Sequence, residues 1–254
     1  VNKAFQFDGT TYAEITTGAE PLMPSHVAEY REHLFLGYAG RVVFSSPGMP
    51  LDYTALNGAG EIAVGDTVTG LQELQGGVLG IFCKDRIRIL QGSSIDDFVL
   101  TKFSDTGAVE DSIQSIFSDV IYADKQIQRL SATDTFGDFS SSSLSEPIRN
   151  FITSTLQSVQ FSYVSPEKNQ YTLFNQNGTG YVATFDDGRL VGFTFLQARH
   201  VFVCGGRFEL EDGMSIILTG SSNGFVYQME TGTSFDGLPI QAYLQLAPIH
   251  MGNF

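Results

Sequence analysis

Residues 216–237 of the chain read IILTGSSNGFVYQMETGTSFDG. An apolar, β-branched run, a Ser-Ser-Asn-Gly turn and an alternating Phe-Val-Tyr-Gln-Met run predict a β-hairpin followed by a glycine-bearing loop. Asn-Gly tolerates positive φ and therefore turns the chain sharply. The same order of strand, turn and strand recurs at Asp8-Gly9, Asn177-Gly178 and Asp187-Gly188. Repetition of one hairpin unit predicts radially repeated sheets, as in a β-propeller.

Length and composition fit one large all-β domain. The chain has 254 residues, 27 of them Gly, and only 17% are charged, a mixture typical of many short strands joined by tight turns. We therefore expect residues 1–254 to form a single β-propeller-like domain of repeated antiparallel hairpins with one short helix. Trp is absent, which removes the aromatic residue that marks WD-type blades.

The chain is strongly acidic. Its formal net charge is −14, from 28 acidic and 14 basic residues. It therefore lacks the basic surface with which proteins grip phosphate backbones, and tight DNA binding is not expected. The excess of acidic residues has two interpretations. It keeps a large β-protein soluble and protects its sheet edges from pairing, or it lines a channel through which a polyanion slides.

Cys83 and Cys204 both lie in apolar strand patterns. No second ligand stands at metal spacing, so we expect two buried free thiols rather than a disulfide or a metal pair. No apolar run approaches the roughly 18 to 20 residues that span a bilayer, and no signal peptide is recognisable, so no membrane partner is expected. The chain begins at Val1 and enters a strand pattern almost at once, so we expect that an N-terminal portion is missing.

More than a dozen strands are predicted, and the first hairpin is expected to turn its apolar side chains, Phe5, Phe7, Tyr12 and Ile15, inward. One helix is predicted after the Ser145-Glu146-Pro147 start signal. Its apolar stripe consists of residues spaced by four, Ile148, Ile152 and Leu156.

Two stretches read as irregular structure. Residues 58–70 hold four glycines among small apolar residues and are interpreted as a connecting loop with a short strand, while residues 96–108 are polar. A phosphate-binding glycine loop is not supported, because no Walker Lys or dinucleotide spacing follows. Arg86 and Arg88 alternate with apolar residues and share one strand face, which is either solvated or faces an acidic partner.

No catalytic constellation stands out in the sequence. His26, His33, His200 and His250 are scattered, none with a second His or a carboxylate at ligand spacing on one strand face, and we expect them on the surface or in loops. A Gly-x-Ser-x-Gly nucleophile elbow is absent.

Two pairs of adjacent carboxylates, Asp96-Asp97 and Asp186-Asp187, are interpreted as turn residues, because neighbouring side chains on a strand point to opposite faces. Residues 134–138, Asp-Thr-Phe-Gly-Asp, resemble a calcium loop but lack its spacing and its distal Glu. We therefore predict no catalytic, cofactor-binding or metal-binding residue, no cofactor, and a protein that is not an enzyme.

Short hairpin phrases are spread over nearly the whole chain. They are KAFQFDGTT (3–11), ITTG (15–18), PSHV (24–27), LFL (34–36), SSPGMP (45–50), GIFCKDRIRIL (80–90), ATDTFG (132–137), KNQYTLF (168–174) and NGFVYQ (223–228). Together these phrases resemble β-propeller virion proteins of tailed bacteriophages.

The resemblance implies a structural tail component of the nozzle or hub type, located in the virion. In that setting six copies form a tube below the portal and adaptor rings, so the expected partners are other copies in a homo-hexamer, the adjacent tail and adaptor proteins, and genomic DNA that passes without tight binding. Family members are usually longer on the N-terminal side. Acid on the lumen of such a tube would repel phosphate.

Two other functions stay open. One is an extracellular carbohydrate-binding or glycan-cleaving β-propeller, and the other is a cell-surface adhesion module. A sialidase-type enzyme would need an arginine cluster, a Tyr-Glu pair and Asp-box turns that end in Trp, and the chain has no Trp.

Overall fold

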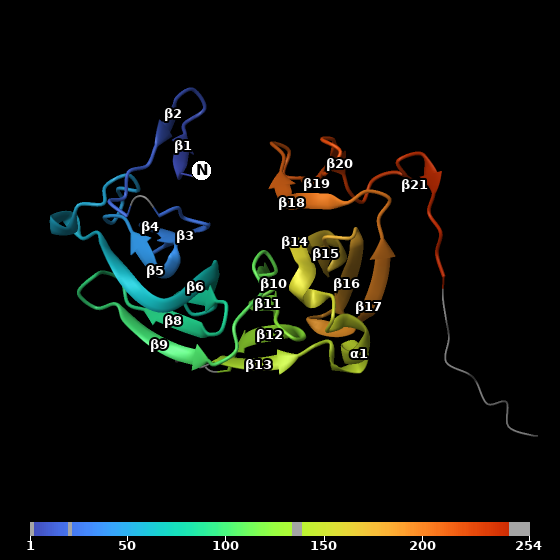
Figure 1. The fold of residues 1–254 in the computed structure, drawn as a ribbon, viewed down its shortest axis with the longest axis horizontal. Helices are drawn as coiled ribbons and strands as arrows, with labels where there is room; N and C mark the ends of the chain where they lie inside the picture. Colours follow the sequence, from blue (N-terminus) through green and yellow to red (C-terminus); the bar gives the residue numbers. More distant parts are fainter. Residues whose placement is uncertain (1–2, 20–21, 134–138, 244–254) are drawn as a thin grey trace, which may run out of the picture.

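The computed structural model describes residues 3–19, 22–133 and 139–243. It is mostly β, with 54% strand and 7% helix, and its strands form antiparallel sheets arranged in an arc (Figure 1). This confirms the predicted fold class, a β-propeller-like arrangement of repeated hairpins. Within the described ranges the arc contains five blades, which we number in chain order.

Consecutive strands pair in every blade. Blades 1 and 2 form one seven-stranded sheet from β3 (His26–Tyr30), β4 (His33–Gly37), β5 (Ala39–Phe44), β6 (Gly60–Leu74), β7 (Val78–Cys83), β8 (Ile87–Gln91) and β9 (Val99–Ser104). Blade 3 consists of β10 (Gln114–Ile116), β11 (Asp119–Ala123), β12 (Ile127–Ala132) and β13 (Phe139–Ser143). Blade 4 consists of β14 (Val159–Ser165), β15 (Gln170–Asn175), β16 (Thr179–Asp186) and β17 (Arg189–Gln197). Blade 5 consists of β18 (Phe202–Glu209), β19 (Ser215–Ser221) and β20 (Val226–Gln228).

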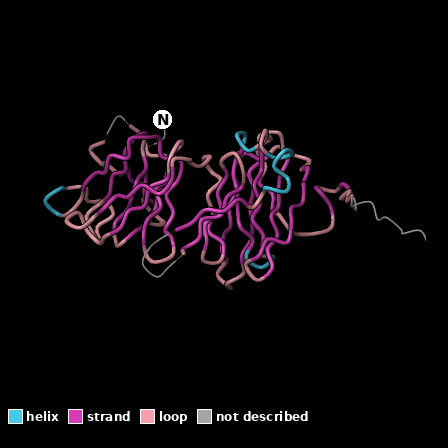
Figure 2. Tube along the Cα trace, turned by 90° about the horizontal axis from the view of Figure 1, so that it is seen from below, coloured by secondary structure: helices cyan, strands magenta, loops and turns pink. Residues whose placement is uncertain are grey.

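Two hairpins and a few helical turns complete the described fold. The hairpins are β1 (Phe5–Phe7) with β2 (Tyr12–Glu14), and β21 (Ser234–Phe235) with β22 (Leu238–Pro239). The helical segments are α1 (Arg149–Ile152) and the 3-10 turns η1 (Ala55–Asn57), η2 (Glu146–Ile148), η3 (Leu156–Ser158) and η4 (Pro166–Lys168). Seen from the side, strands run through both halves of an elongated molecule and the helical segments lie at its periphery (Figure 2).

Blades 1 and 2 share the longest strand, β6. Its first half, up to Thr67, pairs with β5, and its second half, from Val68, pairs with β7. The prediction of a loop over residues 58–70 is therefore wrong. Glycine is frequent there because the chain bulges at Gly65, where φ is +71°, and because Gly70 packs directly against a neighbouring strand.

The apolar cores lie between neighbouring blades. Phe82 of blade 2 and Tyr122 of blade 3 meet in one cluster, with ring centroids 5.5 Å apart. Blades 3 and 4 enclose another cluster, in which the fully buried Tyr171 meets the helical segment. Ile152 and Leu156 are buried there, so the predicted helical stripe is confirmed, although the segment is broken into η2, α1 and η3 rather than forming one helix.

Each of the four Asn/Asp-Gly turns predicted from the sequence joins two paired strands. Their glycines, Gly9, Gly178, Gly188 and Gly224, all have positive φ. Other details were wrong. The polar stretch 96–108 contains the strand β9, which pairs with β8 at the edge of the sheet. An edge strand of this kind needs apolar side chains on only one face, so its sequence can be largely polar.

The first hairpin also differs from the prediction. Phe7 and Tyr12 are 65% and 68% exposed, and Phe5 is also exposed, whereas they were expected to point inward. Among the described strands, β1 and β2 pair only with each other, and β20 leaves one edge of blade 5 unpaired. The β1–β2 hairpin and blade 5 lie at the two ends of the arc (Figure 1). Both ends carry exposed apolar side chains.

We expect Gly70→Ala to lower the free energy of unfolding by roughly 1–3 kcal/mol, measured by urea denaturation. A Cβ at Gly70 would lie 2.2 Å from Ile113 Cδ1, so the Ile113 side chain would have to leave its packed position between blades 2 and 3.

Gly192→Ala is the matched control, since a Cβ there has nothing within 4 Å and the strand conformation suits Ala. Equal stability of the two variants would contradict the close approach of the blades at Gly70.

Candidate functional site at the propeller axis

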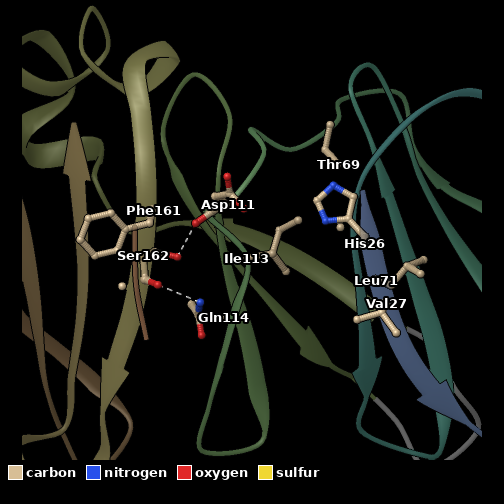
Figure 3. Close-up of a pocket in the computed structure, with 11 residues that line it drawn as sticks. His26, Val27, Thr69, Leu71, Asp111, Ile113, Gln114, Phe161 and Ser162 are labelled. Atoms are coloured by element: carbon tan, nitrogen blue, oxygen red, sulfur yellow. Dashed lines mark hydrogen bonds between the residues drawn. The ribbon is translucent and has the colours of Figure 1, made fainter. Parts of the chain in front are cut away.

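The first strands of the five blades converge on a cavity of about 200 Å³. It is lined by residues of β3, β6, the segment that leads into β10, β14 and β18 (Figure 3). The lining residues are His26, Val27, Thr69, Gly70, Leu71, Asp111, Ile113, Gln114, Phe161, Ser162 and Gly205. A cavity to which every blade contributes lies on the propeller axis, and in propellers and barrels such central cavities hold ligands or form channels.

Two polar side chains of the cavity wall have atoms without a hydrogen-bond partner. His26 Nε2 lies 3.3 Å from Glu110 Oε1, which is an ion-pair distance, but the two groups are not aligned for a hydrogen bond. Thr69 is 93% buried by area, being 7% exposed, and its Oγ1 has no partner among the described protein atoms. Buried polar atoms are nearly always satisfied in native proteins, so these two atoms are exceptions, and each has less than 1 Å² of accessible surface.

Asp111 is the carboxylate of this cavity. Loss of hydration raises the pKa of Asp111 above its ordinary value of 3.8, Glu110 raises it further, and His26 opposes the shift. The side chain is open to solvent by area, so its desolvation comes from the surrounding cavity walls rather than from full burial. The backbone of Asp111 has φ +60°, which directs the chain into β10.

The chain around Asp111 is fixed to blade 4 by hydrogen bonds. Ser162 Oγ donates to the Asp111 carbonyl oxygen at 2.7 Å, and Gln114 Nε2 donates to the Ser162 carbonyl oxygen at 3.0 Å (Figure 3). Tyr171 Oη donates to the Ser112 carbonyl oxygen at 2.7 Å. These bonds hold the position of Asp111 without using its carboxylate, which stays free for a ligand.

A second cavity of about 410 Å³ continues along the axis. It shares Gln114, Ser162 and Gly205 with the first cavity and adds both a basic and an acidic side chain, Arg207 and Glu209. The two cavities are therefore neighbours, separated by residues that line both.

A third cavity, of about 260 Å³, lies away from the axis beside blade 5. The His200 ring stacks on Tyr227 with centroids 4.8 Å apart, and His200 Nε2 lies 3.1 Å from Asp236 Oδ2. Lys168 Nζ pairs with Glu230 at 2.9 Å. Because its charged groups already pair with one another, this cavity is a weaker candidate than the axial one.

The histidines follow the predicted surface or loop positions only in part, since His200 lies in the loop between β17 and β18 whereas His26 lies in β3. His33 is buried against the rings of Phe35, Phe44 and Phe98, and its Nδ1 lies 2.5 Å from the Ser45 carbonyl oxygen, so the prediction of a surface or loop position is wrong. His26 and His200 each meet a carboxylate from a distant part of the chain. His250 lies outside the described residues.

The cysteines and the acidic pairs follow the predictions in most respects. Both thiols are free and Cys83 is buried, where burial raises its pKa to about 12, but Cys204 is exposed and not buried as predicted. Asp97 is confirmed as a turn residue, because the backbone amides of Ser93 and Ser94 donate to its carboxylate. Asp187 turns the chain between β16 and β17.

Two further predictions concern arginines and metals. Arg86 lies 3.6 Å from Asp66, and Arg88 has a buried Nε without a partner, so the two side chains do not form a simply solvated face.

Residues 134–138, which resemble a calcium loop in sequence, lie outside the described chain. Within the described chain no three His, Cys, Asp or Glu residues come together as a metal site, and no described helix is long and apolar enough to cross a membrane.

Comparison with known proteins gives a fold relationship. No protein-family model matches the chain, and no curated protein sequence matches it. Among solved structures, the fold is similar to a catalytically inactive variant of virginiamycin B lyase from Staphylococcus aureus with quinupristin. The TM-score is 0.51 and the identity is 12%, over 85% of this chain and 73% of the lyase chain. An identity this low establishes a shared β-propeller fold and nothing more.

The likeness corrects one prediction from the sequence. The chain was expected not to be an enzyme, but the propeller that it matches is a lyase. The absence of a local motif was a weak argument, because residues that line a propeller axis come from strands far apart in the sequence, as His26 and Asp111 do here. Only a pairing of blades, which no local pattern encodes, brings those residues together.

We expect Asp111→Asn to raise the free energy of unfolding at pH 7. A raised pKa means that the folded state disfavours the charged carboxylate, so its cost is present above the folded pKa and disappears below the ordinary value of 3.8. Urea denaturation at pH 7 and at pH 3.5 measures the difference, and Asn also tolerates the positive φ.

Asp97→Ala should change the free energy of unfolding in the opposite direction, because the pKa of Asp97 is lowered rather than raised. Hydrogen bonds from Ser93 and Ser94 lower the pKa of Asp97 to about 2, so this variant should lose stability at pH 7, and the loss should shrink as pH falls from 4 toward 2. The same sign for both variants at pH 7 would contradict the assigned surroundings of the two carboxylates.

Proposed function

We propose that the protein is a structural component of a bacteriophage tail, a nozzle or hub ring that forms part of the conduit for DNA ejection through homo-oligomeric assembly. The observation that carries the proposal is the pair of unsatisfied ends of the blade arc, together with the resemblance of the hairpin phrases to propeller proteins of phage virions. In this function the protein is located in the virion tail.

The two ends present different surfaces. One end carries the β1–β2 hairpin with its exposed aromatic side chains, and the other carries the unpaired edge of β20, where Phe225 and Val226 are 67% and 69% exposed. Isolated two-stranded hairpins are marginally stable, and free strand edges readily pair with another chain. Contact between two different patches of identical chains is head-to-tail, and such contacts generate rings when the rotation closes. This supports the homo-hexamer that the resemblance implies.

Charge supports a conduit rather than a DNA clamp. At −14 for each copy, a ring of six accumulates a negative charge too large to be carried on its outer surface alone without strong self-repulsion. Acid toward the lumen would repel phosphate and let DNA pass without tight binding. The remaining surfaces would contact the adjacent tail and adaptor proteins.

A second candidate is a propeller that binds or cleaves a small substrate, such as a glycan, in the axial cavity. It is favoured by the raised pKa of Asp111 beside His26 and Glu110, since such shifts are common among catalytic acids and bases. The similar structure is a lyase with quinupristin. Incubation of the purified protein with a glycan panel and with quinupristin tests this candidate, and it fails if neither is bound or converted.

Mass photometry and negative-stain imaging of the purified protein should show rings with sixfold symmetry and an open lumen. Phe7→Ser should shift the population toward monomers, because it removes an exposed aromatic from the contact. Val191→Ser is the matched control, since Val191 is 68% exposed but lies on β17, away from both ends of the arc.

Rings that form equally well in both variants would exclude the hairpin as the contact. Monomers at every concentration, also in the presence of the adjacent tail ring, would contradict the proposed function. In the assembled phage, reversal of lumen-facing acids to Lys should slow genome ejection, and unchanged ejection kinetics would exclude the role assigned to the charge.

A further inference from the structure

Blade 5 packs on blade 4 with only one of its two faces. Ile217 and Tyr227 point to that side, where they pack in the apolar cluster that contains Phe161 of blade 4. Because side chains alternate along a strand, their neighbours in β18, β19 and β20 point to the other side. That side, the end face of blade 5, consists of Cys204, Phe208, Ile216, Leu218, Val226 and Gln228. Phe208 is 52% exposed and Val226 is 69% exposed, so no described blade covers the end face (Figure 1).

The β1–β2 hairpin leaves its apolar face uncovered in the same way. Ala4, on the opposite face of the hairpin, packs against the apolar cluster of blade 1 that contains Leu36. Phe5, Phe7 and Tyr12 form the hairpin face, which points away from that cluster, and the rings of Phe5 and Tyr12 stack 4.8 Å apart. A strand that packs on one side normally turns its apolar residues to the core and its small or polar residues to solvent. The reversed order here indicates that a partner covers the hairpin face.

Both faces lack unpaired charge, although the chain carries a formal net charge of −14. The residues of the end face include no Asp, Glu, Lys or Arg. Next to the hairpin face, Glu14 is paired with Lys3 at 2.5 Å. Two copies with the same large negative charge repel one another, so a contact between them needs surfaces that bring no unpaired carboxylates together. A basic partner would instead dock on acidic surface, which neither face offers. A second copy of the chain is therefore the partner that fits these faces.

We propose that the end face of blade 5 in one copy packs on the hairpin face of a second copy, sheet against sheet rather than strand edge against strand edge. The inference rests on the homo-oligomeric assembly of the proposed function and adds the two surfaces that make its contact. It extends the packing within the chain, where apolar clusters lie between one blade and the next. Because the two faces differ and lie at opposite ends of the arc, the contact is head-to-tail (Figure 1).

The test is complementation between two variants, followed by sedimentation velocity over a range of protein concentrations. Phe208→Asp changes the end face and Tyr12→Asp changes the hairpin face. Each variant alone should associate about tenfold or more weakly than the native protein, because every contact would bury a carboxylate among apolar side chains. Val191→Asp is the matched control, since Val191 is 68% exposed on β17 and belongs to neither face.

A mixture of the two variants should form dimers and nothing larger. The Tyr12→Asp copy keeps a native end face and the Phe208→Asp copy keeps a native hairpin face, so a mixed pair has one intact contact and no means of extending it. A symmetric contact between two hairpin faces would instead leave Phe208→Asp unaffected.

Thiol crosslinking locates the contact independently of these variants. Cys204 lies on the end face and is exposed, whereas Cys83 is buried. Thr10→Cys places a second exposed thiol in the hairpin turn, beside the hairpin face. A bismaleimide with a short flexible spacer, to which each thiol adds across a carbon–carbon double bond, should join Cys204 of one copy to residue 10 of another. The same variant with Cys204→Ser should give no such product.

Several results would overturn the proposal. They are native protein that stays monomeric at every concentration, native-like association of Phe208→Asp, a mixture that forms no dimers, and a crosslink formed only within single chains. Urea denaturation of each variant checks the fold, and both exposed positions should leave the midpoint close to that of the native protein.

Failure of this contact is distinguishable from failure of the proposed function. Complementation and crosslinking between copies without sixfold rings would support the contact and contradict the nozzle function. Sixfold rings that persist in Phe208→Asp would leave the nozzle function intact and overturn the contact.

Discussion

Neighbouring blades approach one another so closely at the axis that, at two glycine positions, an added Cβ would press on a side chain of the next blade. A Cβ at Gly70 would lie 2.2 Å from Ile113, and a Cβ at Gly205 would lie 2.4 Å from the ring of Phe161. These contacts bring blade 2 close to blade 3 and blade 4 close to blade 5 at the axis. The cores between the blades, the shape of the axial cavity and the position of its polar groups all depend on that spacing, because packed interiors do not deform continuously.

The same geometry places polar groups where apolar packing cannot satisfy them. The strands diverge just enough to leave a cavity, and His26, Thr69 and Asp111 belong to its wall, where His26 Nε2 and Thr69 Oγ1 are buried without a hydrogen-bond partner. The cost of leaving these atoms unpaired is offset by the cores between the blades, where residues such as Phe82 and Tyr171 are fully buried. A fold that is stabilised at its blade interfaces can therefore tolerate a polar, functional axis.

The ends of the arc are governed by a different constraint. Among the described strands, β1 and β2 pair only with each other, and β20 is an outer edge strand of a blade, as β9, β13 and β17 are. The two ends also carry exposed apolar side chains, Phe7 and Tyr12 at one and Phe225 and Val226 at the other. The proposed assembly would use the ends of the arc, whereas the axial cavity lies at its centre.

The sequence by itself determined the all-β class, the position of the Asn/Asp-Gly hairpin turns and the apolar stripe of the helical segment, because each depends on residues that are near neighbours along the chain. Local pattern failed at β6, where glycines required by contacts with distant residues looked like those of a loop, and at His33, which is buried by aromatic rings of other strands. The axial site was beyond prediction for the same reason. His26, Thr69 and Asp111 belong to different blades, and only the tertiary structure, through the packing of one blade on the next, brings their side chains to one cavity.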